Sequence, residues 1–364
     1  MKIIMIGRAT LFTHPGGDTM QLVKTAEYLN KLDDIEVEVS SADQEIDFNS
    51  YDLLHLFNIS RPSDHLGFIK RCPKPYVIST VFVDFSEAEK NHFQFKRRLL
   101  YQCLSANQLE YIKALGRIIK GQDKMTDFRY LLKGHRRSIR FILKKADMLL
   151  PNSKNEYHRL VKAYGIKQRY AVIPNAIDLN TFQINEGQVP NEYEKFNNAV
   201  ISVGQITPVK NQLGLIKALS GSEFKVFIIG SPSSNALAYF ERCRAVAGDN
   251  INFVSHLTQE ELAFVYFKAK VHALASWFET TGLVSLEAAF LGCNIVISNR
   301  GDQKEYFRND AYYCDPDHET TILDAVRAAF AAEFNQAFKA RIKNEHSWEV
   351  TAQKTYFAYK QIID

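Results

Sequence analysis

The chain has 364 residues, of which 46% are hydrophobic and 24% are charged, and its formal net charge is +4. This length suffices for two domains, each with its own core. No apolar run approaches the roughly 20 residues that a membrane-spanning helix needs, and the opening MKIIMIG is too short for a signal peptide. The five cysteines form no C-x-x-C pair, which argues against a disulfide framework or a zinc site and indicates a cytoplasmic protein.

The N-terminal part begins with a predicted strand, Lys2–Gly7, and a loop that ends in Gly16 and Gly17. Asp18 or Thr19 can cap the helix that follows. A strand, a glycine loop and a capped helix form a turn that accepts anions, although an ordinary strand-to-helix turn has the same pattern. The sequence matches neither G-x-G-x-x-G nor the P-loop pattern, so neither nucleotide-binding motif is predicted.

Further apolar runs predict buried strands that alternate with helices, at Val37–Ser40, Leu53–Asn58, Tyr76–Thr80 and Ala146–Pro151. This alternation indicates a parallel sheet with both faces covered. Two polar residues in this region are candidates for contacting a substrate. His55 lies inside an apolar strand, where a core histidine is the alternative, and Asp84 follows the carboxyl end of another strand.

Residues 90–145 form a basic block with 15 Lys/Arg and three acids, so the segment carries +12 and the remainder of the chain −8. Apolar residues at helical spacing interrupt the charge, and the clusters FKRRLLY and HRRSIRFILKK are typical of cationic amphipathic helices. Three interpretations remain open: a solvated helix face, contact with an anionic membrane surface or a lipid-diphosphate, and nucleic-acid binding. We expect no nucleic acid, because no recognised binding motif accompanies the charge.

A polar, irregular stretch at 179–198 is interpreted as an interdomain linker. After it, a second set of strands is predicted at Ala199–Val203, Phe224–Ile229, Ile251–Val254, Val271–Ala275, Asn294–Ile297 and Tyr312–Cys314. Trp348–Ile363 has the pattern of a final helix. Two consecutive parallel-sheet units predict a two-lobed protein whose ligand lies in the cleft between the lobes.

Two segments in the second set of strands contain residues that could bind or react with a substrate. In the first, Val203–Asn211, Lys210 stands at the start of a helix, where its charge adds to the helix dipole and suits a diphosphate; an ordinary surface lysine is the alternative. In the second, Val271–Glu287, a strand and a loop lead into a helix that opens near Gly282. The amides at this start favour an anion, and glycine lets a phosphate come close.

Two glutamates, Glu279 and Glu287, bracket this helix start with seven residues between them. A pair of carboxylates can serve as the acid and nucleophile of a hydrolase. A general acid beside bound phosphates is unfavourable, however, so we prefer carboxylates that contact hydroxyl groups. No His/Cys/Asp/Glu cluster has metal-ligand spacing, so we expect neither a metal nor another cofactor.

These residues resemble the retaining glycosyltransferases of family 4, which have the GT-B fold. The shared features are the Glu-x7-Glu segment, the following EAAFLGCNIVIS at 287–298, and the hinge-like Pro174–Asp178, with Ala176 where glycine is usual. The resemblance implies two Rossmann-like domains whose parallel sheets face each other across a cleft. Residues 1–176 would bind the acceptor, with the C-terminal helix 350–364 packing back on them, and residues 177–349 would bind a nucleotide-sugar donor.

The resemblance also implies roles for individual residues. Glu279 would contact the transferred sugar and Lys210 the donor phosphate, and both are the candidate catalytic residues. Glu287 would bind the ribose hydroxyls. The remaining candidate donor-binding residues are Gly16, Gly17, Gln205, Thr281, Gly282, Leu283 and Val284. Gln205 replaces a common arginine, and the family's histidine near Asp84 is missing, which leaves Asp84 and His55 as acceptor-side candidates.

The predicted function is that of a retaining, metal-independent hexosyltransferase, which moves a hexose from a nucleoside-diphosphate sugar to a sugar or lipid-linked glycan in bacterial polysaccharide, lipopolysaccharide or glycolipid synthesis. The alternatives are a sugar-nucleotide-binding protein that has lost turnover, a sugar-nucleotide epimerase on the same fold, and a basic membrane or nucleic-acid adaptor. The expected location is cytoplasmic, with the inner face of the plasma membrane as an alternative.

Overall fold

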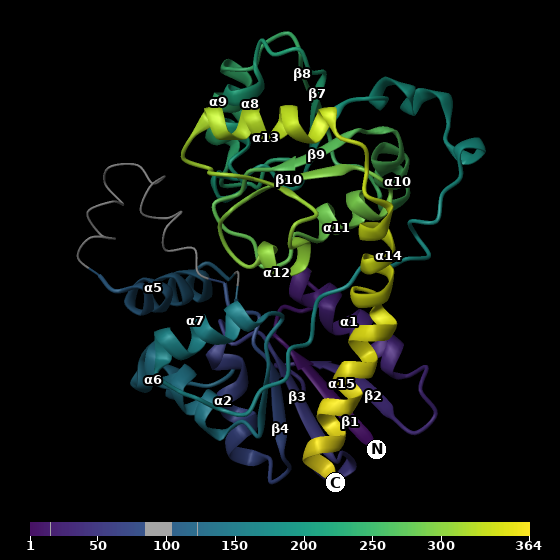
Figure 1. Ribbon diagram of the computed structural model, residues 1–364. Helices are drawn as coiled ribbons and strands as arrows, with labels where there is room; N and C mark the ends of the chain where they lie inside the picture. Colours follow the sequence, from purple (N-terminus) through teal and green to yellow (C-terminus); the bar gives the residue numbers. More distant parts are fainter. Residues whose placement is uncertain (15, 84–103, 122) are drawn as a thin grey trace. The chain divides into compact units, whose positions relative to one another are not determined.

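The structure is a computed structural model and describes residues 1–14, 16–83, 104–121 and 123–364 (Figure 1). The described residues divide into two compact units. The N-terminal unit comprises residues 1–83, 104–176 and 348–364, and the C-terminal unit comprises residues 177–347. Within the described residues the chain passes between the units at 176–177 and at 347–348, and these two passages meet in a parallel bridge between Ile177 and Ser347. The described part of the C-terminal unit is thus a segment whose two ends lie together.

The N-terminal unit is built on a five-stranded parallel sheet in the order β2-β1-β3-β4-β5. Its strands are β1 (Lys2–Gly7), β2 (Glu36–Ser41), β3 (Leu53–Phe57), β4 (Tyr76–Ser79) and β5 (Met148–Leu150). Its helices are α1 (Gly17–Leu29), α2 (Pro62–Arg71), α5 (Ala106–Ile119), α6 (Arg129–Lys145), α7 (Lys154–Tyr164) and α15 (Trp348–Ile363).

Both faces of this sheet are covered, because alternate residues of each strand point to opposite sides. Ile3 and Met5 pack in one core with α1 and α15, whereas Ile4 and Ile6 pack in another with α2, α6 and α7. The last helix, α15, therefore belongs to the N-terminal unit, and Tyr359 on it is fully buried. Figure 1 shows this helix in yellow beside α1.

The C-terminal unit has a six-stranded parallel sheet in the order β11-β10-β9-β6-β7-β8. Its strands are β6 (Val200–Val203), β7 (Val226–Ile229), β8 (Ile251–Val254), β9 (Val271–Leu274), β10 (Asn294–Ser298) and β11 (Tyr312–Cys314). Its helices are α8 (Gln212–Leu219), α9 (Leu237–Ala245), α10 (Gln259–Lys268), α11 (Leu283–Phe290), α12 (Gln303–Phe307), α13 (Glu319–Ala331) and α14 (Gln336–Glu345). Helices α8, α9 and α13 cover one face, and α10, α11 and α14 cover the other.

Every predicted strand is present and parallel, within two residues of its expected ends. The interpretation of residues 179–198 as a linker is wrong. Phe182, Tyr193 and Phe196 from this segment are buried in the core of the C-terminal unit. The polar residues between these aromatic side chains hid this role in the sequence, and short 3-10 helices at Glu186–Gln188 and Asn191–Phe196 give the segment local structure.

Among the described residues, no helix combines the length and hydropathy required to cross a membrane. Part of the predicted basic block, including FKRRLLY, lies outside the described residues, as does Asp84.

Candidate functional site

The order of the strands brings three loops of the C-terminal unit together. Strands β10, β9 and β6 are neighbours in the sheet and all run in the same direction, so the loops that follow them meet at one edge. The backbone confirms this meeting: the amide of Trp277 donates to the carbonyl of Val209 at 2.8 Å, and the amide of Asp302 donates to the carbonyl of Glu279 at 2.8 Å. The loop after β9 is therefore held on both sides.

Lys210 and Glu279, 69 positions apart in the sequence, form an ion pair in this loop cluster. Lys210 Nζ lies 2.5 Å from Glu279 Oε1, and the side chains are 27% and 12% exposed. Lys210 ends a short 3-10 turn, Pro208–Lys210, directly before α8. The two candidate catalytic residues thus lie together, and Lys210 has Glu279 as an ion-pair partner.

Helix α11 begins beside this pair, as the sequence predicts. Gly282 is its N-cap and adopts φ +72°, a left-handed conformation that favours glycine. A Cβ at this position would lie 2.5 Å from Gln303 Nε2. The first amides of any helix have no partner within the helix, so the amides of Leu283 and Val284 are available to an anion.

Two buried polar side chains at this helix start have no hydrogen-bond partner among the described residues. They are Thr281, through Oγ1, and Gln303, through both polar atoms of its amide; the two residues are 1% and 0% exposed. Leaving such groups unpaired costs about 1–3 kcal/mol each, so a polar ligand or water that reaches them gains binding energy. Gln303 was not predicted as a site residue. The sequence signal that could have identified it is its position at the start of α12, two residues after Gly301.

Glu287 lies on α11 and accepts a hydrogen bond from the hydroxyl of Tyr266 at 3.3 Å. Loss of solvent around the carboxylate raises its pKa to about 7, and the hydrogen bond from Tyr266 lowers it in part. Tyr266, on α10, is fully buried and was not predicted as a functional residue. A carboxylate that is held by a tyrosine and kept partly from water is suited to accept hydrogen bonds from a ligand's hydroxyl groups.

Gln205, in contrast, is exposed, and its carbonyl, not its side chain, contacts Gln212. In this position it adds no charge to the site. The described residues contain no group of three or more His, Cys, Asp or Glu placed to hold a metal ion.

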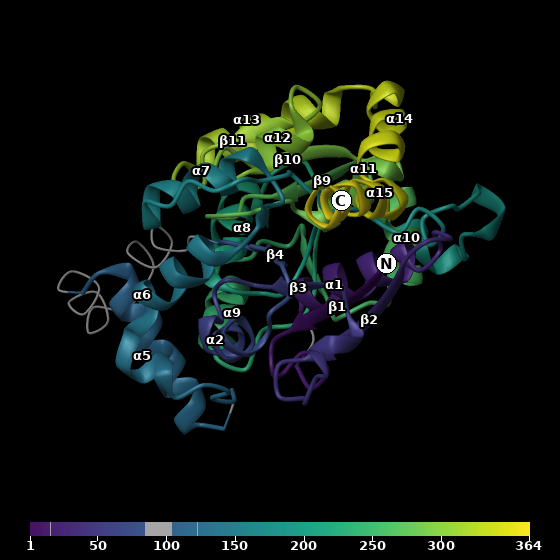
Figure 2. The ribbon, with the colours of Figure 1, turned by 90° about the horizontal axis from the view of Figure 1, so that it is seen from below.

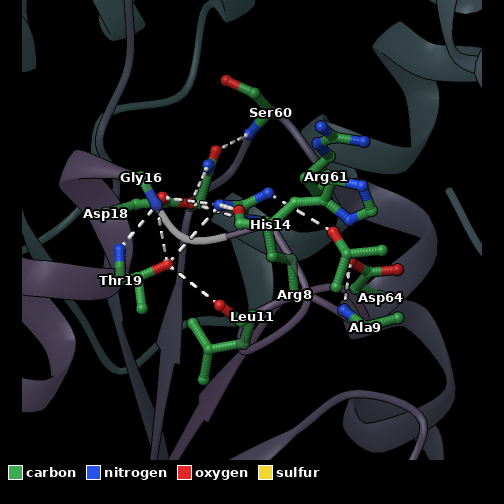
Figure 3. Close-up of polar contacts among 12 residues, drawn as sticks. Arg8, Ala9, Leu11, His14, Gly16, Asp18, Thr19, Ser60, Arg61 and Asp64 are labelled. Carbon is green, nitrogen blue, oxygen red and sulfur yellow. Dashed lines mark hydrogen bonds and ion pairs between the residues drawn. The ribbon is translucent and has the colours of Figure 1, made fainter. Parts of the chain in front are cut away.

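The other predicted site residues belong to the N-terminal unit. Gly16 is the N-cap of α1, and its amide donates to Thr19 Oγ1 at 3.2 Å; Gly17 is the first residue of the helix. Arg8 contacts the residues on both sides of these glycines (Figure 3). Its Nε lies 3.0 Å from Asp18 Oδ2, and its Nη2 donates to the carbonyl of His14 at 2.6 Å.

A polar cluster extends from Arg8 along the carboxyl edge of the N-terminal sheet. Asn58, directly after β3, donates to Asp18 Oδ2 at 2.8 Å, and the amide of Ala9 donates to Asp64 Oδ2 at 3.2 Å. Burial raises the pKa of Asp64 to about 6. Arg8, Asn58 and Asp64 were not predicted, although Arg8 and Asn58 each follow a buried strand directly, which is the pattern that singled out Asp84.

His55 is a core residue, which corrects its candidacy as an acceptor-side group. It is 1% exposed, and its ring bonds the hydroxyls of Tyr359 at 2.6 Å and Ser79 at 2.8 Å. Burial lowers its pKa to about 3. The ring is therefore neutral and links β3 to β4 and α15.

Comparison with known protein families gives a match in the C-terminal part. Residues 185–347 match the model of the family Glycosyl transferases group 1. Curated relatives include D-inositol 3-phosphate glycosyltransferases from Kribbella flavida, 28% identical over 243 residues (60% of this chain, 57% of that protein), and from Nocardia farcinica, 27% identical over 191 residues (47% and 41%). The chain thus matches less than two thirds of the length of these relatives.

Solved structures resemble the chain over nearly its full length. HepE from Anabaena, in complex with UDP, has a TM-score of 0.74 at 14% identity and covers 99% of this chain and 100% of its own. Sucrose-phosphate synthase from Thermosynechococcus elongatus has a TM-score of 0.71 at 16% identity and covers 99% and 98%. At this identity the likeness concerns the fold, and it confirms the predicted class of two parallel-sheet α/β domains of the GT-B type.

Proposed function

We propose that the chain is a retaining glycosyltransferase that moves a hexose from a nucleoside-diphosphate sugar to a sugar or lipid-linked acceptor. The ion pair between Lys210 and Glu279 beside the start of α11 carries this proposal, because it joins a cation, a carboxylate and free amides in one loop cluster. Two comparisons support it. The curated relatives are glycosyltransferases, and a structural neighbour, HepE from Anabaena, was solved with UDP-glucose.

In the proposed reaction, the diphosphate of the donor lies against the amides of Leu283 and Val284, and Lys210 Nζ exchanges Glu279 for a phosphate oxygen. The bond between the anomeric carbon and the diphosphate breaks, and its electron pair goes to the diphosphate oxygen. Lys210 and the helix amides stabilise this negative charge as it develops. Glu279, released from Lys210, faces the sugar and stabilises the positive charge at the anomeric carbon.

The acceptor hydroxyl attacks from the side that the diphosphate leaves, so the configuration is retained. Its proton goes to the departing phosphate oxygen, and the products are the glycoside and the nucleoside diphosphate. We assign the acceptor to the N-terminal unit, where Arg8, Asp18 and Asn58 form a polar cluster at the carboxyl edge of the sheet. Gly16 and Gly17 are assigned to the donor.

A thermal-shift screen against UDP, GDP, ADP and their hexose conjugates tests the proposal. A ligand at 100 times its Kd stabilises a protein by about 2.7 kcal/mol, so the matching nucleotide raises the midpoint of unfolding measurably. The positive ligand is then incubated with a panel of sugar and lipid-linked acceptors, and the anomer formed is identified by NMR. The absence of a shift with every nucleotide contradicts the proposal.

Gln205 favours a second candidate function, that of a sugar-nucleotide-binding protein without turnover. Its side chain is an exposed neutral amide, whereas an arginine at this position would supply a positive charge to stabilise the leaving diphosphate. Nucleotide binding without transfer or donor hydrolysis supports this candidate. Conversion of the donor to its epimer in the absence of acceptor supports an epimerase instead.

Donor affinity is expected to rise with pH between 6 and 8. The carboxylate of Glu287 accepts hydrogen bonds from ribose hydroxyls in its charged form, and its pKa is raised to about 7 in the free protein. Below pH 7 the carboxyl group is mostly protonated, so binding must first remove a proton. One pH unit below this pKa, affinity is expected to fall by about tenfold.

Isothermal titration calorimetry of the nucleotide at pH 6, 7 and 8 measures this dependence. The variant Glu287→Gln is expected to bind more weakly at pH 8 and to lose the dependence. If the variant keeps the pH profile of the unmodified protein, another group is responsible.

A further inference from the structure

Helix α5 of the N-terminal unit buries only part of its apolar face against the described segments. The helix has 14 residues, and its larger apolar side chains are Leu109, Tyr111, Ile112, Leu115, Ile118 and Ile119. Of its side chains from Asn107 to Ile119, none is fully buried. An amphipathic helix on a globular protein normally buries its apolar face against the core. Helix α5 does so through Tyr111 and Ala114 but leaves Ile112 and Ile119 exposed.

Further apolar side chains are exposed at Phe128, the N-cap of α6, and in the first residues of α6. Ile119, Phe128 and Leu132 are 85%, 76% and 87% exposed, and Ile112 and Leu131 are also exposed. Scattered apolar residues on a surface need no explanation, whereas several in one short segment mark an interaction site. We call residues 106–121 and 123–145 the α5–α6 hairpin; both views show its helices side by side (Figures 1 and 2).

This segment is fixed in place, so its exposed side chains do not belong to a loose loop. Tyr130, between Phe128 and Leu132, is 1% exposed and packs at 5.3 Å against the ring of Tyr111. The hydroxyl of Tyr111 donates to the carbonyl of Leu131 at 3.0 Å. The turn is anchored to α2, because Thr126 Oγ1 donates to the carbonyl of Ser63 at 2.8 Å. Burying Tyr130 forces its neighbours outward.

The hairpin is also strongly basic. It has eleven Lys/Arg and three acids, a net charge of +8. Each acid is already paired with a basic residue: Glu110 with Lys113, Asp123 with Arg61 and Arg117, and Asp127 with Arg129. Among the described residues, no carboxylate lies within ion-pair distance of a further set of basic side chains, namely Lys120, Lys133, Arg136, Arg137, Lys144 and Lys145.

We propose that the α5–α6 hairpin docks on an anionic lipid bilayer. Ile119, Phe128 and Leu132 enter the boundary between headgroups and acyl chains, and the unpaired lysines and arginines contact the anionic headgroups. The combination of large apolar side chains with unpaired positive charge fits an interface of this kind. Nucleic acid would engage the charge but leave the apolar side chains in water. The inference does not rest on the proposed glycosyl transfer.

Co-sedimentation of the full chain with lipid vesicles tests the docking, with phosphatidylcholine alone compared with phosphatidylcholine containing phosphatidylglycerol. The unmodified chain is expected to bind the anionic vesicles at least about tenfold more tightly. The triple variant Ile119→Ser, Phe128→Ser, Leu132→Ser is expected to lose binding by at least about tenfold, since three inserted side chains are removed. The charge variant Lys120→Glu, Arg136→Glu, Arg137→Glu is expected to lose on the order of 100-fold.

The chain supplies its own matched control, because Leu237 and Phe357 are 58% and 62% exposed outside the hairpin. The double variant Leu237→Ser, Phe357→Ser is expected to bind like the unmodified chain, and unchanged thermal unfolding of each variant shows that folding is intact. Equal binding of the triple variant and the unmodified chain overturns the proposal, as does equal affinity for neutral vesicles. A dimer in light scattering that the triple variant converts to a monomer assigns the surface to a second copy of the chain and also overturns it.

Discussion

Replacing Lys210 by alanine is expected to lower kcat for glycosyl transfer by about 10²–10³-fold, the loss typical of removing one preorganised donor from a developing negative charge. The lysine is the cation that pairs with Glu279 in the loop cluster, at 2.5 Å. Its removal leaves the helix amides to stabilise the diphosphate without a full charge. Because the side chain is 27% exposed, folding should be little affected.

Steady-state kinetics with the donor found by thermal shift measure this loss. Lys217→Ala is the matched control: Lys217 lies on α8, is 47% exposed and pairs with a carboxylate of Glu319 at 3.6 Å. The Lys217→Ala variant loses one positive charge from the same unit but leaves the pair of Lys210 and Glu279 intact. Its kcat should therefore stay near that of the unmodified enzyme. Equal kcat for both variants would refute the assignment of Lys210.

The double variant Lys210→Ala, Glu279→Ala separates two roles of the glutamate. If Glu279 served only to neutralise Lys210, removing both would restore part of the activity lost in Glu279→Ala. If Glu279 acts on the sugar, the double variant is no more active than either single variant, each of which is expected to lose at least about tenfold.

The second large effect is expected from Gly301→Ala, in the loop after β10. Gly301 adopts φ +80°, and a Cβ there would lie 2.1 Å from the carbonyl oxygen of Glu279. The strained φ costs about 1–3 kcal/mol and relief of the contact costs about 1–3 kcal/mol more. The clash falls on the backbone of Glu279, so the variant is expected to lose turnover as well as stability.

The variant Gly221→Ala measures the cost of the strained φ alone, because Gly221 has φ +72° but no atom lies within 4 Å of an added Cβ. It should lower the midpoint of unfolding less than Gly301→Ala does and leave kcat unchanged. The two variants are compared by thermal unfolding and by kinetics on the same preparations. A Gly301→Ala enzyme that unfolds and turns over like the Gly221→Ala enzyme would show that the loop tolerates the displacement.

Much of the fold follows from the sequence, because its parallel strands are short apolar runs with clear breaks between them. The start of α11 was predicted from a similar pattern: a buried run, β9, is followed by a loop that leads to Gly282. The contact between Lys210 and Glu279 depends on the order of the strands, which puts β6 beside β9. The residue pattern alone does not contain that order, and the resemblance to a known family supplied the pairing.

The sequence analysis missed the features of the site that depend on contacts between residues far apart in the chain. The pKa of Glu287 is raised by burial and lowered in part by the hydrogen bond from Tyr266, 21 positions away in the sequence. The polar cluster of the N-terminal unit joins Asn58 to Asp18 across 40 positions. His55 sits in an apolar run, but its role as a core residue became definite through Tyr359, at the other end of the chain.

The bridge between Ile177 and Ser347 has a practical consequence for dissecting the protein. A segment whose ends adjoin can be excised at the gene level and produced as a separate polypeptide, while a short artificial connector rejoins residues 176 and 348. Each half is then expected to fold by itself, and the proposed nucleotide binding can be assayed in the half that lacks α15.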